Sequence, residues 1–133
     1  MAFENRFSGK TAVVTGGASG LGKDVARRIV AEGGRAILWD VDPDALSAAA
    51  DEIGALAIAA VDVTDYGQVE AAAREAAAAA GALHILVNSA GITGPTTPVK
   101  DFPVDGWAKV LNVNLTGTFH CCRALVPSLI EAG

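Results

Sequence analysis

The chain has 133 residues, of which 51% are hydrophobic and 19% charged, and its formal net charge is −5 at pH 7. This length suits one compact domain and is short for a two-lobed enzyme, and the acidic balance argues against nucleic acid or an anionic membrane surface as a partner. No apolar run approaches the ~20 residues of a membrane span, and Met1 to Arg6 do not resemble a secretory signal, so a cytoplasmic location is expected.

The first predicted elements are a β-branched strand at residues 11–15 and an amphipathic helix at about 20–32. Between them, the sequence from Thr15 to Gly22 reads Thr-Gly-Gly-Ala-Ser-Gly-Leu-Gly. A strand that turns sharply into a helix through glycines lets phosphate groups approach the backbone. The helix then directs unpaired N–H groups and its positive dipole end at the anion. We therefore predict a phosphate-binding turn, with a tight turn that binds nothing as the alternative.

The second predicted strand, at about 35–40, ends in Asp40. An acidic residue roughly 20 residues past the first glycine of such a turn is placed to accept hydrogen bonds from a ribose diol. Its negative charge would repel a 2′-phosphate, and the next residues, Val41 and Asp42, supply no cation. Asp40 therefore favours NAD over NADP, unless it is only an acidic turn residue.

Two other phosphate motifs are only partly matched. Gly20 and Gly22 supply Gly-x-Gly, but Val25 stands where the third glycine of the Gly-x-Gly-x-x-Gly fingerprint belongs. The segment from Gly17 to Lys23 reproduces most of a P-loop, but Asp24 follows where a P-loop needs Ser or Thr to ligate magnesium. The sequence therefore argues against a P-loop.

The next residues continue to alternate between helix and strand without a linker. Asp42 is a predicted N-cap, with Pro43 at the first position of a helix that runs to about residue 53. A third strand is expected at about 55–62. An alanine-rich helix is predicted from Tyr66 to Ala80, with Asp65 as its cap.

The fourth predicted strand, Leu83 to Val87, is apolar throughout, as expected for a parallel strand buried on both faces. A loop with three prolines and a long helical region at about 104–131 follow. These elements predict an α/β fold: the N-terminal half of a Rossmann-type doubly wound parallel sheet, with strand order 3-2-1-4. In such sheets ligands bind at the carboxyl ends of the strands.

Four blocks of the sequence resemble the short-chain dehydrogenase/reductase family. Thr15, Gly16, Gly20 and Gly22 match its Thr-Gly-x-x-x-Gly-x-Gly cofactor turn, and Asp62-Val63 matches its adenine-contacting pair. Asn88-Ser89-Ala90-Gly91 matches its Asn-Asn-Ala-Gly except at Ser89, and Asn112-Val113-Asn114-Leu115 with Gly117 matches the segment that carries its catalytic asparagine. The resemblance covers essentially the whole chain. It implies a catalytic role for Asn114 and cofactor contacts at Thr15, Gly16, Ser19, Gly20, Leu21, Gly22, Asp40, Asp62, Val63, Asn88, Ala90 and Gly91.

The resemblance further implies an NAD-dependent oxidoreductase in which hydride passes between a secondary alcohol or ketone and nicotinamide C4. The family's active site also needs a serine and a Tyr-x-x-x-Lys pair, which come later than the region covered here. Tyr66 is followed four residues later by Glu70, and Ser128 lies inside a predicted helix, so neither fills these roles. We expect residues 1–133 to be an N-terminal part that is inactive alone. A complete, non-catalytic NAD-binding module or sensor is the alternative.

Further expectations concern metals and assembly. The adjacent Cys121 and Cys122 fit a reducing compartment, and with His84 and His120 they lack a zinc-like spacing, so no metal is expected. The resemblance implies a homo-oligomer, a dimer or a tetramer, built on the helix after the fourth strand. The apolar residues of this helix suit either an interface or the core; they are Phe119, Leu125, Val126 and Leu129. The loop from Thr93 to Phe102 is a candidate wall of the substrate pocket.

Overall fold

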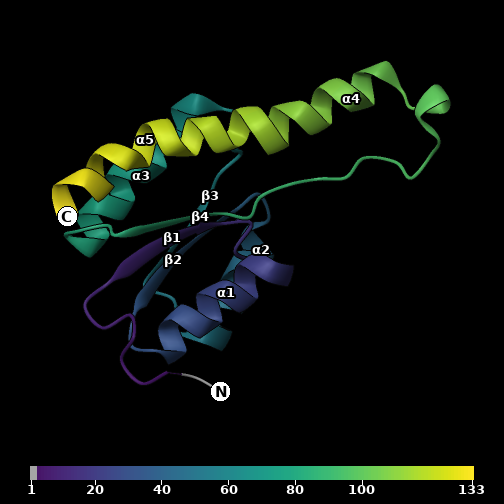
Figure 1. The fold of residues 1–133 in the computed structure, drawn as a ribbon. Helices are drawn as coiled ribbons and strands as arrows, with labels where there is room; N and C mark the ends of the chain where they lie inside the picture. The colour runs from purple at the N-terminus through teal and green to yellow at the C-terminus, as the bar shows by residue number, and fades with distance from the viewer. Residues whose placement is uncertain (1–2) are drawn as a thin grey trace.

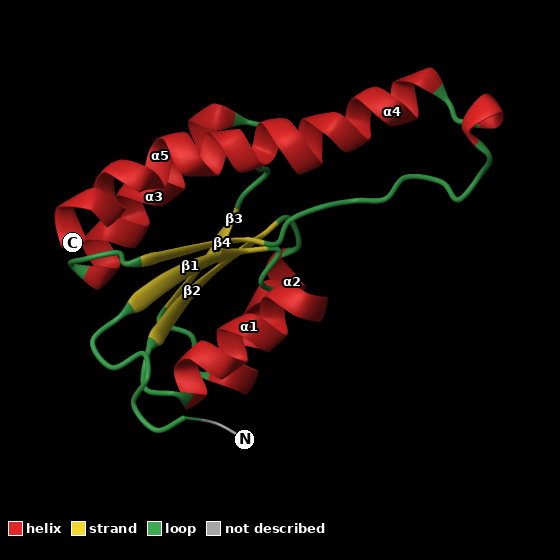
Figure 2. Cartoon of the chain, viewed as in Figure 1, coloured by secondary structure: helices red, strands yellow, loops and turns green. Residues whose placement is uncertain are grey.

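The computed structural model describes residues 3–133 and contains a four-stranded parallel sheet with helices on both faces (Figures 1 and 2). The strand order is β3-β2-β1-β4, which confirms the predicted 3-2-1-4 order. The strands are β1 (Thr11–Thr15), β2 (Arg35–Asp40), β3 (Ala57–Ala60) and β4 (Ile85–Asn88).

Three helices follow the first three strands, as predicted. They are α1 (Gly20–Ala31), α2 (Pro43–Ile53) and α3 (Tyr66–Ala80). The Asp42 side chain accepts hydrogen bonds from the amides of Asp44 and Ala45, and Asp65 accepts one from the Gln68 amide, so both predicted N-caps are confirmed.

Two predicted strands differ from those observed. The third strand is shorter than the predicted 55–62, because only residues 57–60 pair with β2. The fourth begins at Ile85 rather than Leu83, and the prediction that it is buried on both faces is wrong. Within residues 3–133, β4 pairs with β1 alone, so Ile85, Leu86 and Val87 are only half-buried.

The C-terminal region is an almost continuous helical rod (Figure 1). It consists of α4 (Val104–Leu111), a π-helical turn (Asn112–Thr116) and α5 (Gly117–Ala132), preceded by a short 3₁₀ helix (Val99–Asp101). α5 lies beside α3 on one face of the sheet, whereas α4 projects past the strand ends. Within the described part of the chain, no helix combines the length and the apolar character that crossing a bilayer requires.

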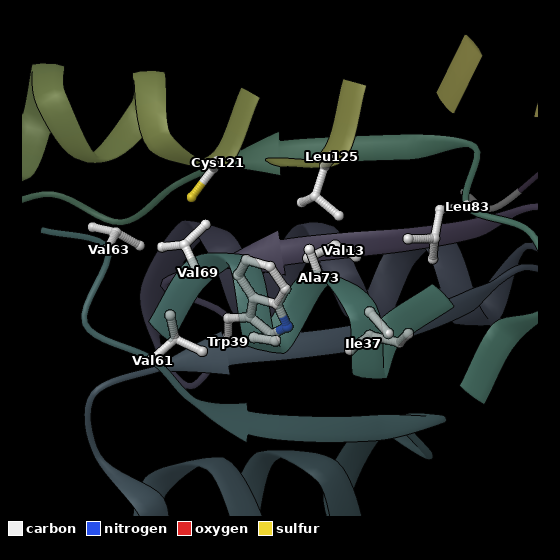
Figure 3. Close-up of a cluster of buried hydrophobic side chains, with 12 residues drawn as sticks. Val13, Ile37, Trp39, Val61, Val63, Val69, Ala73, Leu83, Cys121 and Leu125 are labelled. Carbon is white, nitrogen blue, oxygen red and sulfur yellow. The ribbon is translucent and has the colours of Figure 1, made fainter. Parts of the chain in front are cut away.

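Each face of the sheet has its own hydrophobic core. Between the sheet and the helices α1 and α2, Val14, Leu38 and Leu46 are buried. On the other face Trp39 fills the space between the sheet, α3 and α5, and Cys121 and Leu125 point toward it from α5 (Figure 3).

Some apolar residues of α5 pack in the core and others lie on the surface. Leu125 is buried and Leu129 packs against the core, whereas Phe119 and Val126 are 57% and 39% exposed. Core packing therefore accounts for the first two and leaves the second two on the surface.

Candidate functional site

The carboxyl ends of the four strands open into one cleft of about 620 Å³. Most of the predicted cofactor-binding residues line it; these are Gly16, Ser19, Gly20, Leu21, Asp40, Asp62, Val63, Ala90 and Gly91. The parallel topology explains this gathering, because it brings segments far apart in the sequence to the same edge of the sheet.

The predicted phosphate turn is held by close backbone packing. A Cβ on Gly22 would lie 2.3 Å from the carbonyl oxygen of Gly16, so only glycine fits there. Gly20 instead has a φ of +54° and faces open space, since a Cβ there would meet no atom within 4 Å. The Ser19 side chain makes no capping hydrogen bond, so it does not satisfy the first amides of α1. Open space in front of an uncapped helix N-terminus fits an anionic group.

Asp40 joins the end of β2 to this turn. Its Oδ2 accepts a hydrogen bond from the Ala18 amide at 3.2 Å, and its Oδ1 accepts one from the Val41 amide at 2.8 Å. Each carboxylate oxygen has a second lone pair, so the half-buried side chain can still accept from a hydroxyl in the cleft. The geometry thus leaves Asp40 able to bind a diol.

Asp62 occupies the corresponding position after β3. Its Oδ1 accepts from both the amide and the hydroxyl of Thr64, at 2.9 and 2.7 Å. These hydrogen bonds favour the ionised form and hold the pKa of the Asp62 carboxyl below its ordinary value. Its own amide donates to Gln68 Oε1 at 3.0 Å, so a fixed carboxylate stands at the mouth of the cleft.

The loop after β4 is anchored from two sides. The buried Thr15 hydroxyl oxygen accepts hydrogen bonds from the amides of Ser89 and Ala90, at 3.1 and 3.0 Å. From the other side, the Asn114 side chain pairs with Ile92, whose amide donates to Oδ1 at 2.8 Å and whose carbonyl accepts from Nδ2 at 2.9 Å. The loop is therefore held in one conformation beside the cleft.

Asn114 lies within the π-helical turn Asn112–Thr116, a rare geometry that often marks functional sites. With Gly91 to Gly94 it lines a second, shallower hollow next to the main cleft. The predicted wall from Thr93 to Phe102 thus borders this hollow only through Thr93 and Gly94.

Four predicted site residues lie outside the main cleft lining, namely Thr15, Gly22, Asn88 and Asn114. The first two support the backbone of the turn and the β4 loop. Asn88 Nδ2 instead approaches Cys122 Sγ, at 3.6 Å, on α5.

Several lining residues were not predicted from the sequence, including Trp39, Val41, Thr64, Lys109 and Asn112. Trp39, Val41 and Thr64 lie next to or near predicted site residues in the sequence, and this position could have identified them. Lys109 has no such signal, because only the path of α4 brings it to the cleft.

The contacts of the two cysteines and of His84 indicate structural roles. Among residues 3–133, no group of three or more His, Cys, Asp and Glu side chains is arranged to hold a metal ion. His84 Nδ1 accepts from the Thr11 amide at 3.1 Å. Both cysteines are free thiols, and burial together with the neighbouring Cys122 raises the pKa of Cys121 to about 11. Cys121 is thus an unreactive core residue.

Comparison with known proteins adds relatives of defined activity. The chain is 53% identical over 131 residues to a 2-dehydro-3-deoxy-L-rhamnonate dehydrogenase (NAD(+)) of Sphingomonas sp. strain SKA58, covering 98% of this chain and 53% of the relative. It is 41% identical over 129 residues to a 3-alpha-(or 20-beta)-hydroxysteroid dehydrogenase of Mycobacterium tuberculosis H37Rv, covering 96% and 49%. The chain therefore spans about half the length of the curated relatives it matches.

Solved structures agree in fold. An NAD+-bound xylitol dehydrogenase superposes with a TM-score of 0.89 at 34% identity, over 95% of this chain and 50% of that protein. A carveol dehydrogenase from Mycobacterium avium in complex with NAD gives 0.89 at 27% identity, over 96% and 52%. The short chain dehydrogenase family model matches residues 10–133. The chain belongs to the short-chain dehydrogenase/reductase family.

Proposed function

We propose that the complete protein is an NAD-dependent oxidoreductase that interconverts a secondary alcohol and a ketone. The observation that carries this proposal is that the phosphate turn, which includes Gly20, and Asp40 line the same cleft. The turn offers helix amides and unobstructed space to a diphosphate, and Asp40 offers an acceptor to the adjacent ribose.

The remaining cleft residues suit the other parts of a dinucleotide. The Asp62 carboxylate and the buried Val63 stand at the β3 end, where an adenine amine and ring would meet one polar and one apolar group. Ala90 and Gly91 line the other end, in the loop after β4 to which Asn114 bonds. NAD would supply the nicotinamide ring that accepts or donates hydride, while the protein positions it and excludes water.

Asn114 is proposed as the catalytic residue that this chain contributes. It stands in the π-helical turn and borders the hollow next to the cleft. We propose that a serine and a Tyr-x-x-x-Lys pair of the complete protein supply the acid–base chemistry, since a phenol beside a lysine has the lowered pKa that proton transfer at neutral pH needs. Residues 1–133 alone are then inactive, as the resemblance implies.

The cellular setting of the complete protein is also proposed. A cytoplasmic homo-oligomer, a dimer or a tetramer, is supported by two free cysteines and by Phe119 and Ile130 of α5, which are 57% and 73% exposed. A net charge of −5 supports a small-molecule substrate over nucleic acid or an anionic membrane.

Calorimetric titration of the complete protein with NAD, NADP and Mg-ATP tests the cofactor assignment. We expect NAD to bind more tightly than NADP, and Mg-ATP to bind weakly. Turnover is then assayed with polyols, hydroxysteroids and 2-dehydro-3-deoxy-L-rhamnonate, the compound classes that the relatives' names suggest. Absence of NAD binding would refute the proposal. NAD binding by a complete protein that also lacks Tyr-x-x-x-Lys would favour a non-catalytic module or sensor.

A further inference from the structure

A histidine on α5 contacts the loop that carries Asp62. His120 Nδ1 lies 2.8 Å from the carbonyl oxygen of Val63, the residue that follows Asp62 in the cleft lining. A carbonyl oxygen can only accept a hydrogen bond, so the contact requires a proton on Nδ1. The half-buried imidazole is therefore a donor to this loop in its neutral Nδ1–H form and in its protonated form.

The imidazole ring is held in this orientation by neighbours from two helices. Tyr66, the first residue of α3, lies with its ring centroid 5.4 Å from that of His120, at an interplanar angle of 60°. The ring of Phe119 lies 6.0 Å away. Arg123 Nε donates to the Tyr66 hydroxyl at 3.2 Å, which fixes Tyr66 in turn. A ring packed in this way loses little further entropy when it makes the hydrogen bond.

α5 also touches the same loop one turn earlier. Gly117 is buried, and a Cβ there would lie 2.5 Å from Val63 Cγ2, so the absence of a side chain lets the helix approach Val63 closely. α5 thus holds Val63 at its side chain and at its carbonyl group.

The loop also makes hydrogen bonds to β2, to α3 and within itself. Val61 donates to the Asp40 carbonyl of β2 at 2.8 Å, and the Asp62 amide donates to Gln68 of α3. The Asp62 carboxylate bonds to Thr64 within the loop itself. His120 therefore adds a tie from α5 to a loop that β2 and α3 already hold.

We propose that His120 is a positioning residue for the adenine end of the dinucleotide. By holding the Val63 carbonyl, it fixes the peptide groups that orient Asp62 and Val63 toward the cleft. This inference rests on the proposed function, since it assumes that the cleft takes an adenine dinucleotide. His120 itself contacts the loop and does not line the cleft.

The test compares two substitutions in the complete natural protein. His120→Leu keeps an apolar side chain of similar size but removes the donor, whereas His120→Asn can place an amide N–H near the position of Nδ1. Calorimetry gives the dissociation constants of NAD, of ADP-ribose, which contains the adenine, and of nicotinamide mononucleotide, which lacks it. We expect His120→Leu to weaken NAD and ADP-ribose binding about 5–10-fold, the effect of one ordinary hydrogen bond. Nicotinamide mononucleotide binding should change less than about 2-fold, and His120→Asn should restore most of the loss.

Leu129→Ala is the matched control, because Leu129 packs against the core on the same helix and does not line the cleft. It should lower the melting temperature without weakening ADP-ribose binding. Equal weakening by Leu129→Ala and His120→Leu, or failure of His120→Asn to restore binding, would overturn the positioning role. Unchanged ADP-ribose binding in His120→Leu would overturn it as well. A wild-type protein that binds no NAD would instead refute the proposed function.

Discussion

The Asp40 carboxylate and the Ala18 amide are joined by a 3.2 Å hydrogen bond that ties the end of β2 to the phosphate turn. The same carboxylate also accepts from the Val41 amide. Asp40 thus has two roles to separate: it supports the turn, and it is the proposed acceptor for the ribose diol.

Substitution of Asp40 tests the proposed cofactor choice. Asp40→Ala should weaken NAD binding by roughly 1–3 kcal/mol, the range for losing a charge-assisted hydrogen bond. Asp40→Asn keeps one oxygen, which can accept from the Ala18 amide, but removes the charge and the bond to the Val41 amide. It should therefore improve NADP binding relative to NAD while keeping the tie to the phosphate turn. Titrations of both variants with both cofactors give the answer. An unchanged preference for NAD in Asp40→Asn would remove the carboxylate charge from that role.

Gly20 is predicted to be intolerant of a side chain. Gly20→Val would combine an unfavourable positive φ with a side chain in the open space proposed for the diphosphate, and should abolish NAD binding. Gly54 is a matched control, because it has a φ of +70°, also faces open space and ends α2 away from the cleft. Gly54→Val should show the backbone strain as a lower melting temperature but bind NAD normally. Normal NAD affinity in Gly20→Val, with a native circular dichroism spectrum, would contradict the phosphate-turn assignment.

Asp62 is predicted to recognise the adenine. Asp62→Ala should weaken NAD binding but barely alter nicotinamide mononucleotide binding, and equal losses for both would indicate a structural role. The hydrogen bonds from Thr64 place the pKa of Asp62 below its ordinary value, so the carboxylate should stay ionised as the pH falls from 8 to 5. Between pH 8 and 5, the NAD affinity of the wild type and that of Asp62→Ala should therefore depend on pH in the same way.

The local features of this fold were predictable from the sequence because neighbouring residues determine them. The caps at Asp42 and Asp65 depend on contacts within a few residues. The glycines of the turn from Thr15 to Gly22 also identify it locally, although Thr15 and Ala18 bond to residues far along the chain. The limits of β3 were not predictable from the sequence, because alanine-rich segments have little preference for a strand. Pairing with β2 decides where the strand begins and ends.

The contacts that complete the site were not predictable because they join distant segments. Asn114 pairs with Ile92 across 22 residues, and His120 meets Val63 across 57. Lys109 reaches the cleft only because α4 continues the line of α5 past the strand ends (Figure 1). Motif spacing identifies the residues of each segment, but the side-chain contacts between segments depend on how the helices pack on the sheet.

The last prediction concerns stability in acid. Glu32, which follows α1, has a fully buried side chain, with Arg6 Nε 2.5 Å from Oε2 and with Arg28 and the Phe3 amide bonded to Oε1. Burial alone would raise the pKa of Glu32, but the hydrogen bonds from Arg28 and Phe3 and the charges of Arg28 and Arg6 outweigh it and lower that pKa. The ionised group therefore stabilises the fold above the pKa of about 4.3 that an unfolded glutamate has. This contribution should be lost as the pH falls through the lower pKa of the folded state.

Glu32→Gln keeps the shape of the side chain but removes its charge, so it should lower the free energy of unfolding at pH 7 far more than at pH 3. Urea unfolding of the complete protein at a series of pH values measures this difference. Glu70→Gln is the control, because Glu70 is exposed and lies 3.8 Å from Arg74 in a surface ion pair, which contributes little in water. The Glu70 variant should follow the wild-type curve, whereas the Glu32 variant should lose part of the acid-dependent slope. Identical slopes for the wild type and Glu32→Gln would show that the folded and unfolded states bind protons at residue 32 equally, contrary to the lowered pKa.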